Sequence, residues 1–165
     1  MVQMLDNPTI QKSIELAIKT EEIGARFYEE LAERFKDEPE IRDIFARLAE
    51  DEKTHEKQFK ELLGKVPKDK DIDPEREVYL KAASVSEFFK TDAFKGIAKV
   101  ETAEEVIQRA FRFEKSTLFY YQALKDVIGE SEELDAIIEM EKQHMTNLMK
   151  VMLNDAKFRG TLDTF

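Results

Sequence analysis

Four segments of this 165-residue chain carry an apolar stripe at helical spacing, and each stripe is interrupted near its middle by a glutamate. In two of the segments a histidine follows that glutamate by three residues, and the chain contains no other histidine. The interrupting residues are Glu21, Glu52, His55, Glu114, Glu141 and His144. Residues three or four apart lie on one face of a helix. A helix that buries such a stripe must therefore bury a carboxylate with it.

The four segments are predicted to be long α-helices, because glycine and proline are scarce (5 and 4 residues) and good helix formers dominate. The expected helices span about residues 8–35, 39–64, 103–128 and 131–153. The first is expected to start with a cap at Asn7, and the second to end at Gly64. A capping box from Thr102 to Glu105 is expected to open the third.

The lengths of the links predict how these helices are arranged. Short links join the first helix to the second and the third to the fourth, so each pair should form an antiparallel hairpin. The long stretch 65–102, in which residues 75–90 are expected to form a short helix, can cross from one end of a bundle to the other. We therefore predict an all-α four-helix bundle of two antiparallel hairpins joined by a long crossover, in a single domain covering residues 1–165.

The two predicted hairpins also match each other residue by residue. A shift of 93 positions, which moves Glu21 onto Glu114, superimposes the first helix on the third. A shift of 89 positions, which moves Glu52 onto Glu141, superimposes the second on the fourth. Other matched pairs are Ile14 and Ile107, Ala17 and Ala110, Tyr28 and Tyr121, Leu31 and Leu124, and His55 and His144. The chain therefore reads as a tandem duplication of one helical hairpin.

Four carboxylates in one interior need compensating charge, because each buried charge would otherwise cost several kcal/mol. Two divalent cations would supply four positive charges against them. Glutamate and histidine together suit iron or manganese. We therefore predict that the six interrupting residues bind two metal ions, with Glu21 and not its neighbour Glu22 as the ligand, since Glu22 aligns with a charged face. The alternative is that the glutamates are solvated charges and the histidines have no function.

Two tyrosines, Tyr28 and Tyr121, follow the single glutamates of the first and third helices by two helical turns. They could fill the core, with each hydroxyl bonded to some buried partner. They could instead hydrogen-bond a metal-bound carboxylate or act as redox-active neighbours of the metal ions. Both interpretations stay open at this point.

Other polar and aromatic residues near the motifs are given ordinary roles. Asp51 and Gln143 could hydrogen-bond metal ligands, but a solvated face of their helices is the preferred interpretation. A phenylalanine group in the crossover is interpreted as a cap on the bundle end or a dimer contact. It consists of Phe88, Phe89 and Phe94.

Composition excludes several classes of function. The formal net charge of -10 argues against nucleic acid or an anionic membrane surface as a partner. No apolar run approaches the roughly 20 residues that a membrane span needs, and the start lacks the pattern of a secretory signal, so we expect a cytoplasmic protein. The absence of cysteine excludes disulfides, iron–sulfur clusters and thiol nucleophiles from these residues.

The chain resembles the rubrerythrin-type branch of the ferritin-like superfamily. The resemblance rests on residues 17–28, on the Glu-Lys-Thr-His motif at 52–55, on residues 114–121 and on the Glu-Lys-Gln-His motif at 141–144. It implies a ferritin-like bundle with a non-haem di-iron site, in which the glutamates of the two Glu-x-x-His motifs bridge the metals and each histidine caps one. Such proteins reduce hydrogen peroxide or dioxygen, often as dimers in cells under oxidative stress.

Two departures from the family pattern alter what the resemblance implies. Rubrerythrins with a fused rubredoxin domain hold an electron-transfer iron on four cysteines, whereas these residues include none, so an external electron-transfer protein is expected. Such proteins also carry an extra glutamate three residues after the third-helix ligand. Here that position is Thr117, which implies a more symmetric site of four glutamates and two histidines.

Three alternative functions are compatible with such a metal site. The first is an oxidoreductase that reduces peroxide or dioxygen at two iron ions, with manganese or a mixed pair as an alternative metal content, in a homodimer or larger homo-oligomer. The second is a ferroxidase or iron-storage subunit of a ferritin-like shell. The third is a bundle in which the ions only neutralise the glutamates.

Overall fold

The structure is a computed structural model that describes residues 8–68, 70–84 and 102–154. These residues form five α-helices and no strand. The helices are α1 (Ile10–Arg34), α2 (Pro39–Lys65), α3 (Pro74–Ser84), α4 (Ala103–Ile128) and α5 (Glu132–Asn154). The four predicted long helices agree with α1, α2, α4 and α5 to within two residues at each end. Among the described residues, no helix is long and apolar enough to cross a membrane.

The short helix expected at 75–90 is present as α3, which ends at Ser84. The rest of that expected range lies outside the described residues, as does the phenylalanine group of Phe88, Phe89 and Phe94.

Two of the expected helix ends differ from the structure. The N-cap of α1 is Thr9, whose Oγ1 accepts the N–H of Lys12 at 3.1 Å, so the cap expected at Asn7 was placed too early. Helix α2 continues through Gly64 to Lys65, where nothing crowds the glycine. Glycine is tolerated within the last turn of a helix, and only a left-handed conformation would have made it the stop. Gly129 has such a conformation, with φ +87°, and ends α4.

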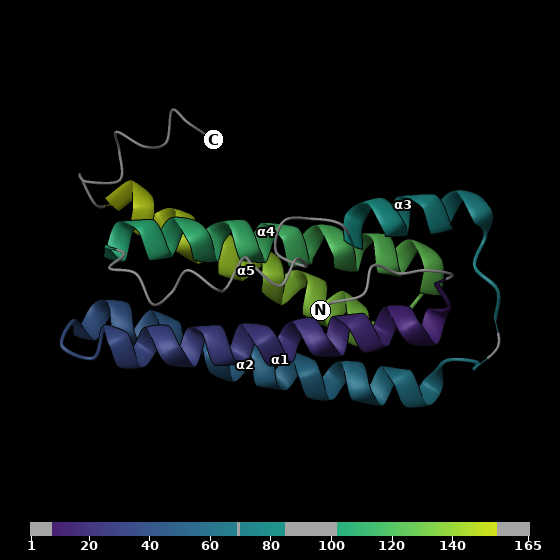
Figure 1. The fold of residues 1–165 in the computed structure, drawn as a ribbon, viewed down its shortest axis with the longest axis horizontal. Helices are drawn as coiled ribbons and strands as arrows, with labels where there is room; N and C mark the ends of the chain where they lie inside the picture. The colour runs from purple at the N-terminus through teal and green to yellow at the C-terminus, as the bar shows by residue number, and fades with distance from the viewer. Residues whose placement is uncertain (1–7, 69, 85–101, 155–165) are drawn as a thin grey trace.

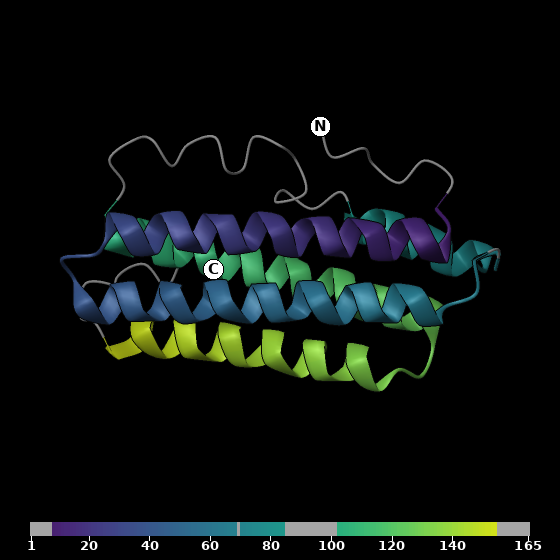
Figure 2. The ribbon, with the colours of Figure 1, turned by 90° about the horizontal axis from the view of Figure 1, so that it is seen from below.

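The long helices form two antiparallel hairpins, α1–α2 and α4–α5, that pack side by side (Figures 1 and 2). Helices α2 and α4 run in the same direction, so the chain between them crosses from one end of the bundle to the other (Figure 1). Helix α3 lies in this crossover and packs on α4, where Arg76 Nη1 donates to the carbonyl of Asp126 at 2.7 Å. The predicted fold class is therefore confirmed.

The core consists of two apolar clusters, one toward each end of the bundle. One cluster includes Ile14, Phe59 and Leu134, and the other includes Phe45 and Ile107. Along every long helix, the residues of the first cluster are separated from those of the second by the interrupting glutamates and histidines. The bundle therefore has a polar layer across its middle, closed off above and below by packed apolar side chains.

The capping box of α4 offers a test of local stability. Thr102 Oγ1 accepts the N–H of Glu105 at 3.2 Å, and Glu105 Oε2 accepts the N–H of Thr102 at 2.8 Å. Thr102→Ala should lower the free energy of unfolding by about 1 kcal/mol, because the N–H of Glu105 loses its acceptor at the helix start. Urea unfolding followed by circular dichroism measures this.

The matched control is Thr146→Ala in the middle of α5, where the exposed hydroxyl donates only to the carbonyl of Lys142. This variant should change stability by less than about 0.5 kcal/mol. Equal losses from the two substitutions would contradict the capping assignment.

Candidate metal centre

All six side chains predicted to bind metal lie buried in the middle of the bundle. Each of them is exposed by 3% or less. Glu22, the competitor of Glu21, instead pairs at 3.2 Å with Lys19 at the surface, as expected. The alternative that the four glutamates are solvated charges is therefore wrong. That they bind metal ions stays a prediction.

The six residues form two overlapping sets of ligand atoms. The first set is Glu21, Glu52, His55 and Glu141, and the second is Glu52, Glu114, Glu141 and His144. Within each set, one side-chain N or O atom of every residue lies within 4.8 Å of all the others. The glutamates of the two Glu-x-x-His motifs belong to both sets, whereas each remaining residue belongs to one. Two neighbouring ions that shared two carboxylates would require such an arrangement.

Buried polar atoms without partners support a cation at this place. Glu21 Oε2, Glu52 Oε1, Glu141 Oε1 and His55 Nδ1 have no hydrogen-bond partner and no contact with solvent. His55 Nδ1 lies 2.9 Å from Glu141 Oε1 and 3.6 Å from Glu21 Oε2, without hydrogen-bond geometry to either. Such atoms are rare in folded proteins, and each would cost about 1–3 kcal/mol. Carboxylate and imidazole atoms that converge on one place without other partners fit ligands around a metal ion.

The two predicted tyrosines hydrogen-bond carboxylates across the bundle. The hydroxyl of Tyr28 on α1 donates to Glu114 Oε1 on α4, and the hydroxyl of Tyr121 on α4 donates to Glu21 Oε1 on α1. Burial, reinforced by the nearby carboxylates, raises the pKa of both tyrosines well above the usual value. They therefore keep their protons and act as donors. Of the two interpretations open from the sequence, this geometry supports the hydrogen bond to a carboxylate.

Asp51 does not belong to the solvated face to which the sequence assigned it. Its side chain is 29% exposed, and its Oδ2 lies 3.2 Å from Nε2 of His144. The other ring nitrogen of His144, Nδ1, lies 3.2 Å from Glu114 Oε2. The assignment of Asp51 was wrong because the partner is on α5, 93 residues away in the chain. Gln143 is exposed, as expected.

Gly24 is a residue of the site that sequence reasoning missed. A Cβ atom there would lie 2.5 Å from Glu52 Oε2 and 2.9 Å from Phe113 Cε1, so only glycine fits beside this carboxylate. The 93-residue shift pairs Gly24 with Thr117, and that mismatch was the available signal. The hydroxyl of Thr117 lies 2.9 Å from Glu141 Oε2 and 2.9 Å from the carbonyl oxygen of Glu114, so these two acceptors share its one proton. The two shared glutamates therefore have different surroundings.

Burial makes two of the carboxylates poor acids. Burial and the carboxylates of Glu21 and Glu114 raise the pKa of Glu52 well above the usual glutamate value. Burial and the carboxylate of Glu114 likewise raise the pKa of Glu141 to about 8. When no metal is bound, both groups therefore hold a proton more tightly than an exposed glutamate does.

The pKa values of the two histidines are also raised, but here the cause is the nearby carboxylates and not burial. Burial lowers the pKa of His55, but the nearby Glu141 more than offsets this and raises it to about 10. Burial also lowers the pKa of His144, but Asp51 and Glu114 raise it to about 11. Burial raises the pKa of Glu114, yet the hydrogen bond with His144 brings it below the usual value. Protons thus balance the buried charge when no metal is bound.

The metal-free protein should lose stability as the pH rises. Glu52, Glu141, His55 and His144 all have folded-state pKa values above their unfolded ones, so the folded state binds more protons than the unfolded state. Its melting temperature should therefore fall between about pH 5 and pH 8. Because metal ions replace these protons, adding Co²⁺ should raise the melting temperature more at the higher pH.

Differential scanning calorimetry of the metal-free and Co²⁺-loaded protein at both pH values measures these effects. The surface variant Glu22→Ala should behave as the unaltered chain does. A melting temperature of the metal-free protein that rises over this range would contradict the assignment.

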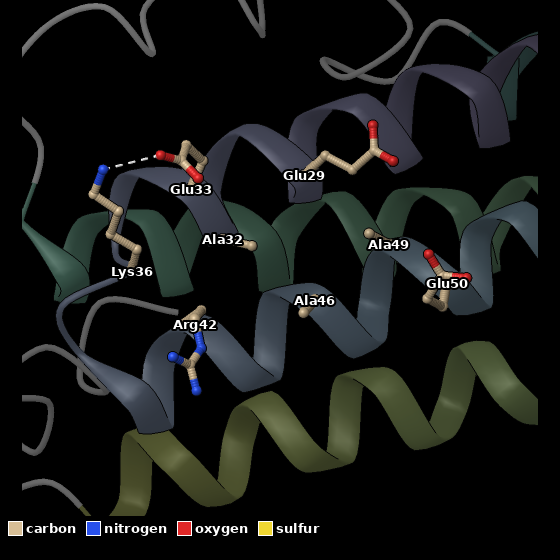
Figure 3. A pocket seen from close by; sticks show the side chains of 8 residues that line it. All are labelled: Glu29, Ala32, Glu33, Lys36, Arg42, Ala46, Ala49 and Glu50. Atoms are coloured by element: carbon tan, nitrogen blue, oxygen red, sulfur yellow. Dashed lines mark hydrogen bonds and ion pairs between the residues drawn. The ribbon is translucent and has the colours of Figure 1, made fainter.

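A surface groove between α1 and α2 lies apart from this centre. Figure 3 shows it near the turn that joins the two helices, with Lys36 Nζ donating to Glu33 Oε1 at 3.1 Å. The groove is lined by Glu29, Ala32, Glu33, Lys36, Arg42, Ala46, Ala49 and Glu50. None of the six predicted ligands lines it, so this groove is not the candidate site.

Comparison with known proteins identifies the fold and the family of this chain. A crystal structure of a protein from Thermotoga maritima, described as a ferritin-like diiron-carboxylate protein, has a TM-score of 0.63 to this chain at 24% identity. The match covers 87% of this chain and 94% of that one, and it confirms the predicted ferritin-like fold. No curated protein sequence matches the chain. The rubrerythrin family matches residues 12–152, which is most of the chain. The chain is therefore a member of the rubrerythrin family.

Proposed function

We propose that this protein binds two iron ions and uses them to reduce hydrogen peroxide or dioxygen. The observation that carries the proposal is the pair of overlapping ligand sets that share Glu52 and Glu141, with four buried ligand atoms left without partners. Family membership adds support, because it places the chain among ferritin-like diiron-carboxylate proteins. Glutamate and histidine donors also suit manganese, so a mixed pair fits the same site.

Each residue of the centre has a definite part in this proposal. Glu21 and His55 would hold one ion, Glu114 and His144 would hold the other, and the two shared glutamates would serve both. When bound, the ions would supply the change of oxidation state that reduction of an oxidant requires.

The surrounding residues orient these ligands and keep bulk water away. The hydroxyls of Tyr28 and Tyr121 donate to Glu114 and Glu21, which fixes the direction of each carboxylate. The apolar clusters on both sides of the layer exclude bulk water. A small oxidant is therefore the class of substrate that suits this interior.

The electrons are proposed to come from a separate electron-transfer protein. These 165 residues contain no cysteine that could hold a rubredoxin-type iron or an iron–sulfur cluster. We further propose that the chain works as a homodimer or larger homo-oligomer.

Anaerobic loading with ferrous iron tests the reaction. The protein should take up two irons per chain, and hydrogen peroxide or dioxygen should then oxidise them at a rate that stopped-flow absorbance measures. Fast oxidation at two irons per chain would support the oxidoreductase. Continued uptake to hundreds of irons per particle would instead favour the ferroxidase and storage function, and binding without oxidation would favour a structural role.

Ligand variants test the placement of the centre. Glu52→Ala and His144→Ala should each abolish binding of two ions, because the first removes a shared ligand and the second removes the histidine of one set. The controls are Glu22→Ala and Gln143→Ala, which alter a half-buried and an exposed neighbour of the ligands and should leave two ions bound. Metal analysis after gel filtration measures the stoichiometry. Two ions in either ligand variant would show that the centre lies elsewhere.

A further inference from the structure

The two halves of the centre differ around their histidines. The repeat that relates α2 to α5 moves His55 onto His144, and the same shift moves Asp51 onto Met140. A carboxylate therefore stands beside His144, whereas the repeat gives the other half a thioether at the equivalent position in the sequence. The predicted ligands are identical in both halves, so the halves differ only in the residues that surround these ligands.

The imidazole rings of His144 and His55 have different contacts in the structure. His144 has a carboxylate at each nitrogen, with Nε2 at 3.2 Å from Asp51 and Nδ1 at 3.2 Å from Glu114. If Nε2 carries the proton and donates it to Asp51, the lone pair of Nδ1 faces the shared interior, where Glu52 Oε1 lies at 3.8 Å. Among the described residues, His55 meets carboxylates only through Nδ1. Nothing described there fixes its tautomer.

A carboxylate on the far nitrogen strengthens a histidine ligand in two ways. It holds the ring in the tautomer and orientation that bind metal, and it raises the basicity of the binding nitrogen. Loss of such a partner typically lowers metal affinity about 10- to 100-fold. The negative charge of Asp51 adds attraction for a cation at that end of the centre.

The second difference between the two repeats, Gly24 in one and Thr117 in the other, affects both ligand sets. Thr117 donates to Glu141, which belongs to both ligand sets, whereas its counterpart Gly24 has no side chain to donate to Glu52. The threonine therefore does not favour one set over the other. Asp51 is the residue that distinguishes them.

We propose that the two metal positions are inequivalent, and that the position capped by His144 binds a divalent transition-metal ion first and more tightly because Asp51 supports that histidine. The position capped by His55 then fills second and exchanges its ion more readily. Asp51 is a positioning residue in this account, since it acts through His144. The inference rests on the proposed metal centre.

Calorimetric titration of the metal-free protein with Co²⁺ tests the inference without any turnover. The unaltered chain should bind two ions in two steps, the first at least about 10-fold tighter than the second. Asp51→Ala should weaken the first step about 10- to 100-fold and leave the second unchanged, so that the steps merge. Asp51→Asn should fall in between, because its amide oxygen still accepts from Nε2 but the charge is lost.

Two further variants serve as controls. Met140→Ala alters the equivalent position beside His55 and should leave both steps unchanged. Thr117→Val removes the hydroxyl from the shared Glu141 and should weaken both steps together. Circular dichroism of each metal-free variant checks the fold, and Asp51→Asn keeps the test available if Asp51→Ala does not fold.

The outcomes separate this inference from the proposed function. Two ions bound with equal affinity by the unaltered chain, or a first step that Asp51→Ala leaves unchanged, would overturn the inference and leave the metal centre standing. Equal weakening of both steps by Asp51→Ala would also overturn it. Failure of the unaltered chain to bind two ions would overturn the proposed function, and the inference with it.

Discussion

The burial of four glutamate carboxylates in one layer of the bundle is the constraint on which the rest of the structure depends. Packed apolar clusters lie on both sides of this layer, so water does not solvate the charges. Only protons or metal ions can then balance them, because an uncompensated buried charge costs several kcal/mol. The raised pKa values of Glu52 and Glu141 indicate that protons can balance the buried charge. The ligand atoms without partners, which converge in two sets, indicate that metal ions can balance it instead.

The same layer joins the two halves of the molecule. Each tyrosine donates to a glutamate of the opposite hairpin, so Tyr28 and Tyr121 form a crossed pair of hydrogen bonds between α1 and α4. Each ligand set likewise draws residues from both hairpins. Neither hairpin could form this centre alone. The stability of the bundle and the geometry of the centre therefore depend on each other.

Departures from the internal repeat show where the two halves have specialised. The glutamates, histidines and tyrosines of the centre are the same in both hairpins. At two other equivalent positions the hairpins differ, since Gly24 corresponds to Thr117 and Asp51 corresponds to Met140. Gly24, Thr117 and Asp51 each lie beside a predicted ligand, and none of them is itself a predicted ligand. A duplicated site keeps its ligands because the charge balance requires them, while the residues around the ligands are free to diverge.

The sequence by itself determined the helices and the burial of the six residues, because both follow from spacing along one helix, and it determined the pairing into hairpins through the short links. A period of 3.6 residues places Glu52 and His55 on the same face as Phe45 and Phe59 whatever the rest of the chain does. Helix ends were less certain, since the cap at Thr9 depends on a single local hydrogen bond. Gly64 has nothing around it that would mark it as a stop.

Only the tertiary structure decided which residues meet across helices. The contact of Asp51 with His144 joins α2 to α5, and the tight fit of Gly24 against Glu52 joins α1 to α2. Such contacts depend on the rotation and offset of one helix against another, which side-chain packing over the whole interface sets. Spacing within one helix carries no information about that rotation, so these supporting residues looked like surface charge and core filler until the helices were assembled.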